Sequence, residues 1–181
     1  MNSPDKDQNT IAFMYGAIWA TLILICIPSV AFSIVASILF IILLITAYVL
    51  RKKSTEGGFV NNHARFIIRT LWFVLFILPA ITLTAAIIYM MPNIDNSAIM
   101  PCAQPLAEYL LENPEDTGMQ TLYGYLLPCM DDFIARNTRV FLIATSIAAL
   151  PLLIYMIYRL GKGTTLTLQS KTHANPKHWL K

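Results

Sequence analysis

The longest uncharged stretch of the chain is QNTIAFMYGAIWATLILICIPSVAFSIVASILFIILLITAYVL, residues 8–50. It contains no Asp, Glu, Lys or Arg. It is more than twice the length of about 20 apolar residues that one membrane-spanning helix needs, so a single helix would extend far beyond both faces of a bilayer. Because Pro28-Ser29 interrupts the stretch, it divides into two spans of suitable length, residues 11–27 and 30–50. We therefore expect a transmembrane helical hairpin over residues 11–50.

The composition of the whole chain indicates the same class of protein. Of its 181 residues, 56% are hydrophobic and 13% are charged, whereas soluble domains carry about 25% charged residues. Two further apolar runs, residues 67–91 and 139–159, are long enough to cross a bilayer. Backbone polar groups in lipid must be satisfied within the span itself, which favours helices. The sequence therefore predicts an all-α integral membrane protein with four transmembrane helices.

The distribution of basic residues predicts how these four spans are threaded. Basic residues cluster between the second and third spans and again after the fourth. They are Arg51, Lys52, Lys53, Arg65, Arg69, Arg159, Lys162, Lys171, Lys177 and Lys181. Because Lys and Arg are enriched in cytoplasmic connections, we expect both termini of this multi-pass protein in the cytoplasm. Residues 1–10 then form a cytoplasmic tail, residues 51–66 a basic cytoplasmic loop and residues 160–181 a basic cytoplasmic tail.

The segment between the third and fourth spans, residues 92–138, is expected on the periplasmic side. It contains seven of the ten acidic residues and a single basic residue, Arg136. Apolar residues recur in it at helical spacing, and Asn113-Pro114 interrupts the pattern, which predicts a cap of two amphipathic helices. Asp131 and Asp132 are interpreted as part of a solvated face rather than as a catalytic pair, because neighbours on a helix point in different directions.

Cysteine usage supports the same orientation. Cys102 and Cys129 both lie in the acidic segment, and in an oxidising periplasm they are expected to form a disulfide. Closing this loop stabilises the segment by roughly 3 to 4 kcal/mol on the loop-entropy relation. Metal binding is the alternative, but the segment has no histidine, and two thiolates do not complete a tetrahedral zinc site. No metal or other cofactor is expected, and Cys26 is interpreted as a small buried apolar residue.

Three features of the spans and the tail lead to further expectations. Pro79 and Pro151 each remove a backbone donor and are expected to bend the third and fourth spans. The middle of the spans carries no ionisable residue, which argues against a pump or a proton-coupled carrier. After the fourth span, residues 164–170 alternate Thr with Leu in a pattern interpreted as a short extended piece.

The cytoplasmic rim is where a binding site is predicted, because basic and aromatic side chains gather there at one depth. The candidate residues are His63, Arg65, Arg69, Trp72, Tyr158 and Arg159. Arg65 and Arg69 share a helix face, and basic pockets of this kind bind anionic lipid head groups. The alternative interpretation is that the arginines only set the orientation and the aromatics form an interfacial belt. The other histidines, His173 and His178, lie in the C-terminal tail, so His63 is not expected to bind a metal.

The segment His63-x-Arg65-Phe66-x-Ile68-Arg69-Thr70-x-Trp72 resembles a His-Phe-Arg-Trp-Gln-Ile-Arg-Thr-Phe-Trp pattern. That pattern occurs in a group of small bacterial inner-membrane proteins without assigned function, distantly likened to magnetosome membrane proteins and chloroplast import-channel subunits. Phe59-Val60 and Tyr158-Arg159-x-x-x-Gly163 resemble the flanking pattern of the same group. Ile67 replaces the glutamine, and the cysteine-bearing outer segment is longer than in the group. The resemblance implies a four-helix inner-membrane protein and brings no established activity.

Three functions from different classes are compatible with these patterns. The favoured one is a non-enzymatic scaffold or assembly component that binds anionic lipid, a membrane-protein partner or a second copy of the chain. The alternatives are an oligomeric channel or transport-complex subunit, and a membrane enzyme that acts on lipid with His63 as general base. No nucleophile surrounds this histidine in the sequence, so the enzyme ranks last and the chain is not expected to be one. Nucleic acid is not an expected partner, because the net charge of +3 is spread along a rim.

Overall fold

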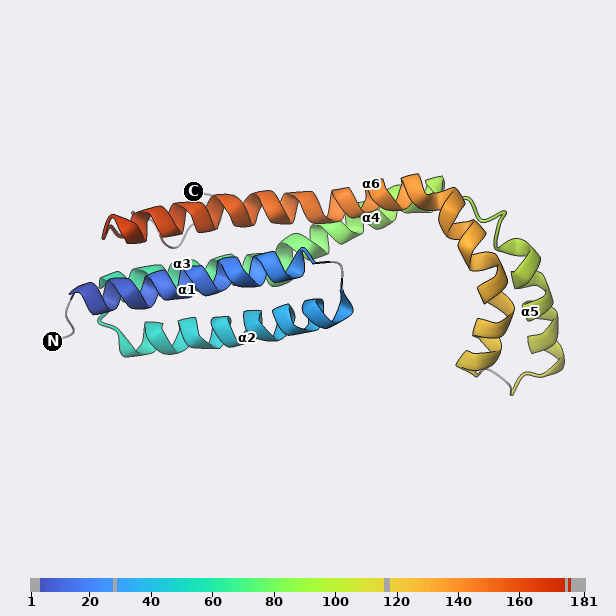
Figure 1. The fold of residues 1–181 in the computed structure, drawn as a ribbon, viewed down its shortest axis with the longest axis horizontal. Helices are drawn as coiled ribbons and strands as arrows, with labels where there is room; N and C mark the ends of the chain where they lie inside the picture. Colours follow the sequence, from blue (N-terminus) through green and yellow to red (C-terminus); the bar gives the residue numbers. More distant parts are fainter. Residues whose placement is uncertain (1–3, 28, 116–117, 175, 177–181) are drawn as a thin grey trace. The chain divides into compact units, whose positions relative to one another are not determined.

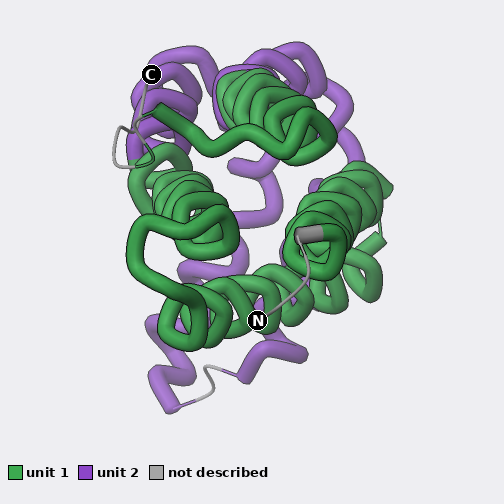
Figure 2. Tube along the Cα trace, turned by 90° about the vertical axis from the view of Figure 1, so that its left-hand side faces the viewer, with its two compact units in different colours: residues 1–80, 151–181 green, residues 81–150 purple. Residues whose placement is uncertain are grey.

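The structure is a computed structural model that describes residues 4–27, 29–115, 118–174 and 176. It consists of α1 (Pro4–Ile25), α2 (Val30–Lys53), α3 (Phe59–Trp72), the π-helical segment η1 (Phe73–Ile77), α4 (Leu78–Asn93), α5 (Met100–Glu112) and α6 (Met119–Leu168) (Figure 1). These described residues contain no strand, which confirms the all-α prediction. They divide into unit 1, Met1–Ala80 with Pro151–Lys181, and unit 2, Ile81–Leu150 (Figure 2).

The helical stretches confirm the predicted number of spans. Within the described residues, four are long and apolar enough to cross a membrane, and they are Asp5–Ile25, Val30–Lys53, Phe59–Asn93 and Met119–Leu168. Their outer faces carry large apolar side chains, with Phe13 and Val30 exposed by 77% and 78%. Exposed apolar faces of this extent are typical of surfaces that contact lipid or a partner. The fold therefore indicates a membrane protein.

In unit 1, α1 and α2 form the predicted hairpin. The predicted break includes Pro28, which lies outside the described residues, and Ser29, which begins α2 in an extended conformation. After α2 the chain turns at Gly57, whose φ of +77° is a conformation that glycine adopts at little steric cost. Because this turn is short, α3 already begins at Phe59. Much of the predicted loop 51–66 is therefore helical, and both His63 and Arg65 lie inside α3 rather than in a loop.

The third span accommodates its internal proline through a change of helix type. In η1 the helix widens, and the N–H of Leu78 donates to the carbonyl of Phe73, five residues earlier. The next residue is Pro79, which has no N–H to donate. A π-type turn beside a proline lets the helix continue where a backbone hydrogen bond is missing. The predicted irregularity at Pro79 thus takes the form of a π segment, whereas α6 runs without a break through Pro151.

The core of unit 1 is built from one face of each of its helices. Its buried apolar residues come from α1, α2, α3 and the C-terminal part of α6, which contributes Met156 and Leu160. The chief α1 members are Ile11, Tyr15 and Ile18. Polar contacts join the same helices, because Trp19 of α1 donates its indole N–H to the hydroxyl of Thr164 in α6 over 3.3 Å. The last 18 residues of α6 are therefore an integral wall of this unit.

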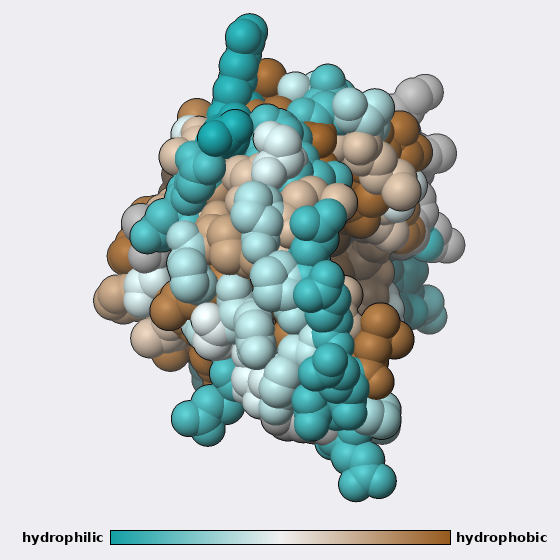
Figure 3. Space-filling view, turned by 90° about the vertical axis from the view of Figure 1, so that its right-hand side faces the viewer, coloured by the Kyte–Doolittle hydropathy of each residue, from teal (hydrophilic) through white to brown (hydrophobic). Residues whose placement is uncertain are grey.

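In unit 2, a disulfide joins α5 to the start of α6. Cys102 and Cys129 are linked, with their Cα atoms 6.2 Å apart, as predicted for this pair. Helix α5 ends where the sequence pattern breaks, with Asn113 as its C-cap. The described acids of α5 and α6, Asp131 and Asp132 included, are exposed. Figure 3 shows the face on the α5 side, where hydrophilic side chains lie among apolar ones. A solvated acidic face is what the sequence predicted.

Three details of the sequence-based description are wrong. Helix α6 is continuous from Met119, so the predicted second cap helix and the fourth span are one helix. Residues 164–168 are helical rather than extended, because the hydroxyls of Thr165 and Thr167 donate to the carbonyls of Gly161 and Gly163 within the helix. Cys26 is exposed at the end of α1 rather than buried. Helix propensity and residue spacing are poor predictors of the conformation of single residues that lie within a long helix.

Candidate functional site

A cluster of polar and aromatic side chains is buried in unit 1, and we call it the His–Arg cluster. Its members are Tyr15 of α1, His63, Phe66 and Thr70 of α3, Arg159 of α6 and His173 of the tail. All of them are buried, and Arg159 and His63 have no exposed surface. Charged and polar side chains are buried at a cost unless they are hydrogen-bonded or stacked. The contacts of these residues therefore define what the cluster does.

His63 occupies the centre of the cluster. Its Nε2 lies 3.0 Å from the backbone carbonyl oxygen of Lys171, and its Nδ1 lies 3.2 Å from the hydroxyl of Tyr15. A carbonyl oxygen only accepts, so Nε2 carries the proton and Nδ1 accepts from the phenol. Both ring nitrogens are thus used inside the protein. His63 connects α3 to α1 and to the tail at the same time.

The tail returns to α3 through a turn at the end of α6. Ser170 has a positive φ of 52°, and the N–H groups of Ser170 and Lys171 donate to the carbonyls of Thr167 and Leu166. This is the hydrogen-bond pattern of a Schellman turn, in which a residue in the left-handed conformation ends a helix. The chain that follows is thereby directed back over α3.

His173 is the residue with which the tail docks. The side-chain amide of Asn62 forms two hydrogen bonds with the backbone of His173. It donates to the carbonyl over 3.0 Å and accepts from the N–H over 2.8 Å. The His173 ring stacks on Phe66 with centroids 3.7 Å apart and lies 4.8 Å from the His63 ring. Burial, aided by the positive charges of Arg159 and Lys162, lowers the pKa of His173 to about 3. The ring is therefore neutral in the folded protein at pH 7.

The opposite face of Phe66 is covered by Arg159. The guanidinium carbon lies 3.7 Å from the Phe66 centroid, and Nε donates to the hydroxyl of Thr70 over 3.2 Å. Cation–π stacking and hydrogen bonds of this kind stabilise a buried guanidinium. Phe66 is thus enclosed between Arg159 and His173. Arg159 was predicted to contact head groups at the rim, and the structure places it in the core instead.

Close approach of α1 and α6 completes the cluster. A Cβ atom added at Gly163 would overlap the phenol ring of Tyr15, so only glycine fits between the two helices at this level. Gly163 also accepts a hydrogen bond from the hydroxyl of Thr167. The spacing Arg159-x-x-x-Gly163, noted in the sequence, therefore places the buried arginine and the close helix contact one turn apart on the same helix.

The remaining predicted site residues lie outside the cluster. The guanidinium of Arg65 forms an ion pair of 2.9 Å with Glu56, and Arg69 is half-buried. Trp72 is 40% exposed and donates its indole N–H to the hydroxyl of Tyr48 over 2.9 Å. Tyr158 is 55% exposed. The six predicted residues therefore separate into two buried ones, His63 and Arg159, and four that are half-buried or exposed.

Sequence reasoning missed several members of the cluster. Tyr15 and Phe66 look like ordinary core aromatics in a membrane helix, and nothing in their spacing points to His63. His173 was separated from His63 by its place in the tail, whereas the structure brings the two rings together. His178 lies outside the described residues. Gly163, a single glycine one turn after an arginine in the last span, was the one signal in the sequence that a close helix contact occurs there.

The contacts of the cluster link three helices and the tail. The space between Tyr15, Phe66, Thr70 and Leu160 is too small to hold a water molecule, and His63 itself has no exposed surface. Among the described residues, no group of three or more His, Cys, Asp or Glu side chains could hold a metal. Both ring nitrogens of His63 are hydrogen-bonded within the protein, Nδ1 to the Tyr15 hydroxyl and Nε2 to the carbonyl of Lys171. The geometry supports a role in joining helices and tail.

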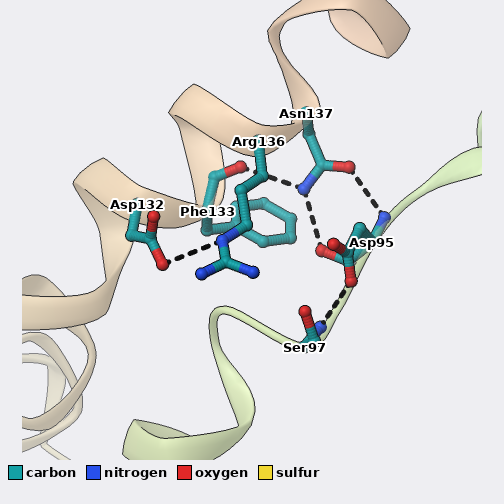
Figure 4. A network of polar contacts seen from close by, with 6 residues as sticks. All are labelled: Asp95, Ser97, Asp132, Phe133, Arg136 and Asn137. Atoms are coloured by element: carbon teal, nitrogen blue, oxygen red, sulfur yellow. Dashed lines mark hydrogen bonds and ion pairs between the residues drawn. The ribbon is translucent and has the colours of Figure 1, made fainter.

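A second polar network stabilises unit 2 (Figure 4). The buried amide of Asn137 in α6 accepts from the N–H of Asp95 over 2.7 Å and donates to the carbonyls of Asp95 and Phe133, each over 2.9 Å. The Asp95 carboxylate accepts from the hydroxyl and from the backbone N–H of Ser97, and these hydrogen bonds lower the pKa of Asp95. Asn137 therefore fastens the segment after α4 to α6.

Fold and cluster together define an all-helical protein of the polytopic membrane class, in which a buried His–Arg cluster joins three helices and the tail. No protein-family model, no curated protein and no solved structure matches the chain.

Proposed function

We propose that this chain is a non-enzymatic scaffold or assembly component of a bacterial inner membrane, with both termini in the cytoplasm. In this proposal its exposed basic end binds anionic lipid head groups or an acidic partner. The basic end consists of Arg51, Lys52, Lys53, Lys162 and Lys171, all of which are exposed. The resemblance of residues 63–72 to a group of small inner-membrane proteins is in keeping with this assignment.

The observation that carries the proposal is that some polar side chains of unit 1 are buried in the core, whereas others at the same end are exposed. His63 uses both ring nitrogens inside the fold, Arg159 donates from Nε to Thr70, and both side chains are fully buried. The lysines and Arg51 at the same end remain exposed. Arg51 is itself linked to α3, because its carbonyl accepts from Asn61 over 3.0 Å. Packed helices that hold exposed Lys and Arg side chains in place are suited to binding lipid head groups. Each Lys or Arg near an anionic surface contributes about 1 kcal/mol.

The test is the lipid and protein content of the chain after extraction in mild detergent. We expect anionic phospholipids to be enriched over their share of the membrane, or an acidic partner to be retained. Replacing Arg51, Lys52 and Lys53 together with Gln should remove the enrichment, whereas Arg136→Gln in unit 2 serves as the matched control and should leave it unchanged. A chain that runs as a lone monomer with bulk lipid composition contradicts the proposal.

The orientation is tested separately with a green fluorescent protein fused after residue 181. This reporter fluoresces when it folds in the cytoplasm, so a fluorescent fusion supports the assignment of the C-terminus. An alkaline phosphatase inserted within residues 113–118 should be active, because that segment is assigned to the periplasm. The reverse pattern of the two reporters overturns the topology.

A further inference from the structure

A groove runs between α1 and α2 on the outside of unit 1, away from the His–Arg cluster. The two helices lie side by side (Figure 1), and the groove between them has a volume of about 910 Å³. On α1 it is lined by Phe13, Ala17 and Ala20, and on α2 by Leu39 and Ile42 among others. The small alanine side chains create the hollow, and the larger apolar residues form its sides.

Three threonines line this groove, but their hydroxyl groups are not available to a ligand. The hydroxyl of Thr10 donates to the carbonyl of Lys6, that of Thr21 to Ala17 and that of Thr46 to Ile42. Each hydroxyl is thus satisfied by the backbone of its own helix one turn earlier. The groove offers almost no polar partner to a ligand along its length, so it favours a hydrocarbon chain over a polar peptide.

One end of the groove has a different character. Asp5, Lys6 and Asn9 line it at the N-terminal end of α1, where the first backbone N–H groups of a helix add positive partial charge. Across the groove, Leu50 lines the end of α2 and is followed directly by Arg51, Lys52 and Lys53. Lys6 lines this mouth beside Asp5, and three further exposed cations follow Leu50 in the sequence. The mouth of the groove is complementary to an anionic group.

The dimensions fit one leaflet of a bilayer. From Thr10 to Thr21 the apolar part of α1 extends about 17 Å at the helical rise of 1.5 Å per residue. One leaflet contributes about 15 Å to the hydrocarbon thickness. If an acyl chain lies in the apolar part of the groove, the head group of the lipid lies beside Lys6, where the lining changes from apolar to polar and charged residues.

We propose that this groove binds a single anionic phospholipid, with one acyl chain between α1 and α2 and the phosphate at Lys6. The inference rests on the membrane location given in the proposed function. It adds one defined lipid site, whereas the proposed function requires only that the basic end binds anionic groups. A second copy of the chain, laid along the same groove, is the rival occupant. It lacks the charge complementarity, because the exposed faces of α1 and α2 within the spans are uncharged.

The experiment measures lipid binding by native mass spectrometry of the full chain in mild detergent. The probes are phosphatidylglycerol and phosphatidylcholine with identical acyl chains. We expect one phosphatidylglycerol per chain, bound more tightly than phosphatidylcholine. Lys6→Gln should weaken phosphatidylglycerol binding by about fivefold, the effect of about 1 kcal/mol for one lysine near an anionic head group. Arg136→Gln, which removes a cation far along the sequence in unit 2, should have no effect.

Filling the groove separates the site from general attraction to the basic end. Ala20 is exposed and lines the groove, so Ala20→Phe should expel the lipid without disturbing the core, and Ala20→Leu should weaken its binding. Ala31→Phe on α2 is the matched control, because Ala31 is equally exposed and does not line the groove. If Ala20→Phe still binds phosphatidylglycerol, the proposed lipid site in the groove is wrong. The same holds if the unmodified chain is a dimer without bound lipid. If only the triple Gln variant at residues 51–53 loses anionic lipid, the proposed function stands and the groove site falls.

Discussion

Gly163→Ala is the substitution for which two physical effects predict opposite signs. Alanine is the better helix former, and in a helix interior it stabilises by about 0.5–1 kcal/mol relative to glycine. At this position, however, the new Cβ would overlap the phenol ring of Tyr15. Overpacking of this kind costs about 1–3 kcal/mol, and displacement of the phenol weakens its hydrogen bond to His63, about 0.5–1.5 kcal/mol more. We therefore expect a net loss of about 1–3 kcal/mol.

The assay is thermal unfolding of the purified chain in detergent. For a protein of this size, 1 kcal/mol shifts the midpoint by about 2–4 °C, so the midpoint of Gly163→Ala should fall by about 2–12 °C. Gly161→Ala is the matched control, because it lies two residues earlier in α6 and a Cβ there meets nothing within 4 Å. It should raise the midpoint slightly. If both variants raise it equally, α1 and α6 do not approach as described. A Tyr15→Leu background should reduce the cost of Gly163→Ala.

Further predictions concern the tail and unit 2. Because the pKa of His173 is about 3 in the folded protein and 6.5 for a histidine side chain in water, the unfolded chain binds more protons between these values. Tail docking should therefore be complete above about pH 6.5 and weaken as the pH falls toward 3. Limited proteolysis of the tail measures this, and His173→Phe should reduce the pH dependence, leaving only the part due to His63, which also bonds the tail. Ser170→Gly relieves a positive φ and should raise the unfolding free energy by up to about 1 kcal/mol, measured by denaturant titration. Replacing both Cys102 and Cys129 with Ser should cost about 3.5 kcal/mol for this sequence separation of 27 residues, measured as the difference in midpoint between oxidised and variant protein. Asn137→Ala removes the fastening of residues 94–97 and should cost about 1–3 kcal/mol, seen as faster amide exchange in that segment; unchanged exchange contradicts the network.

Much of the fold follows from the sequence, because long apolar runs have few alternatives in lipid. The uncharged stretch over residues 8–50 is too long for one span, and its single interruption places the hairpin. The cysteine pair was identifiable from its shared acidic segment. Helix continuity was harder to predict. Nothing in the local sequence shows that α6 runs without interruption through residue 139 and through Pro151, because the conformational preferences of single residues are weak guides to where a helix ends.

The candidate site was only half predictable. His63 and Arg159 stand out as polar residues beside apolar spans, but the sequence assigns both to the rim because that is where isolated charges cost least. Their burial depends on partners far away in the chain. Phe66 stacks on Arg159 and on His173, and Tyr15 reaches His63 from another helix. Such pairings are not encoded in any local spacing, so they become visible only when the helices are packed.

By itself, the sequence determined the class of this protein: four apolar helical spans, an acidic segment with a paired cysteine, and a basic end. These properties depend on composition and period, which act along the chain. The tertiary structure decided which of the basic residues are available. It buries Arg159 and His63 inside unit 1 and leaves Lys6 and residues 51–53 exposed beside an apolar groove. The reason is that the environment of a side chain, and hence its charge, access and partners, is set by residues from other helices that packing brings within contact distance.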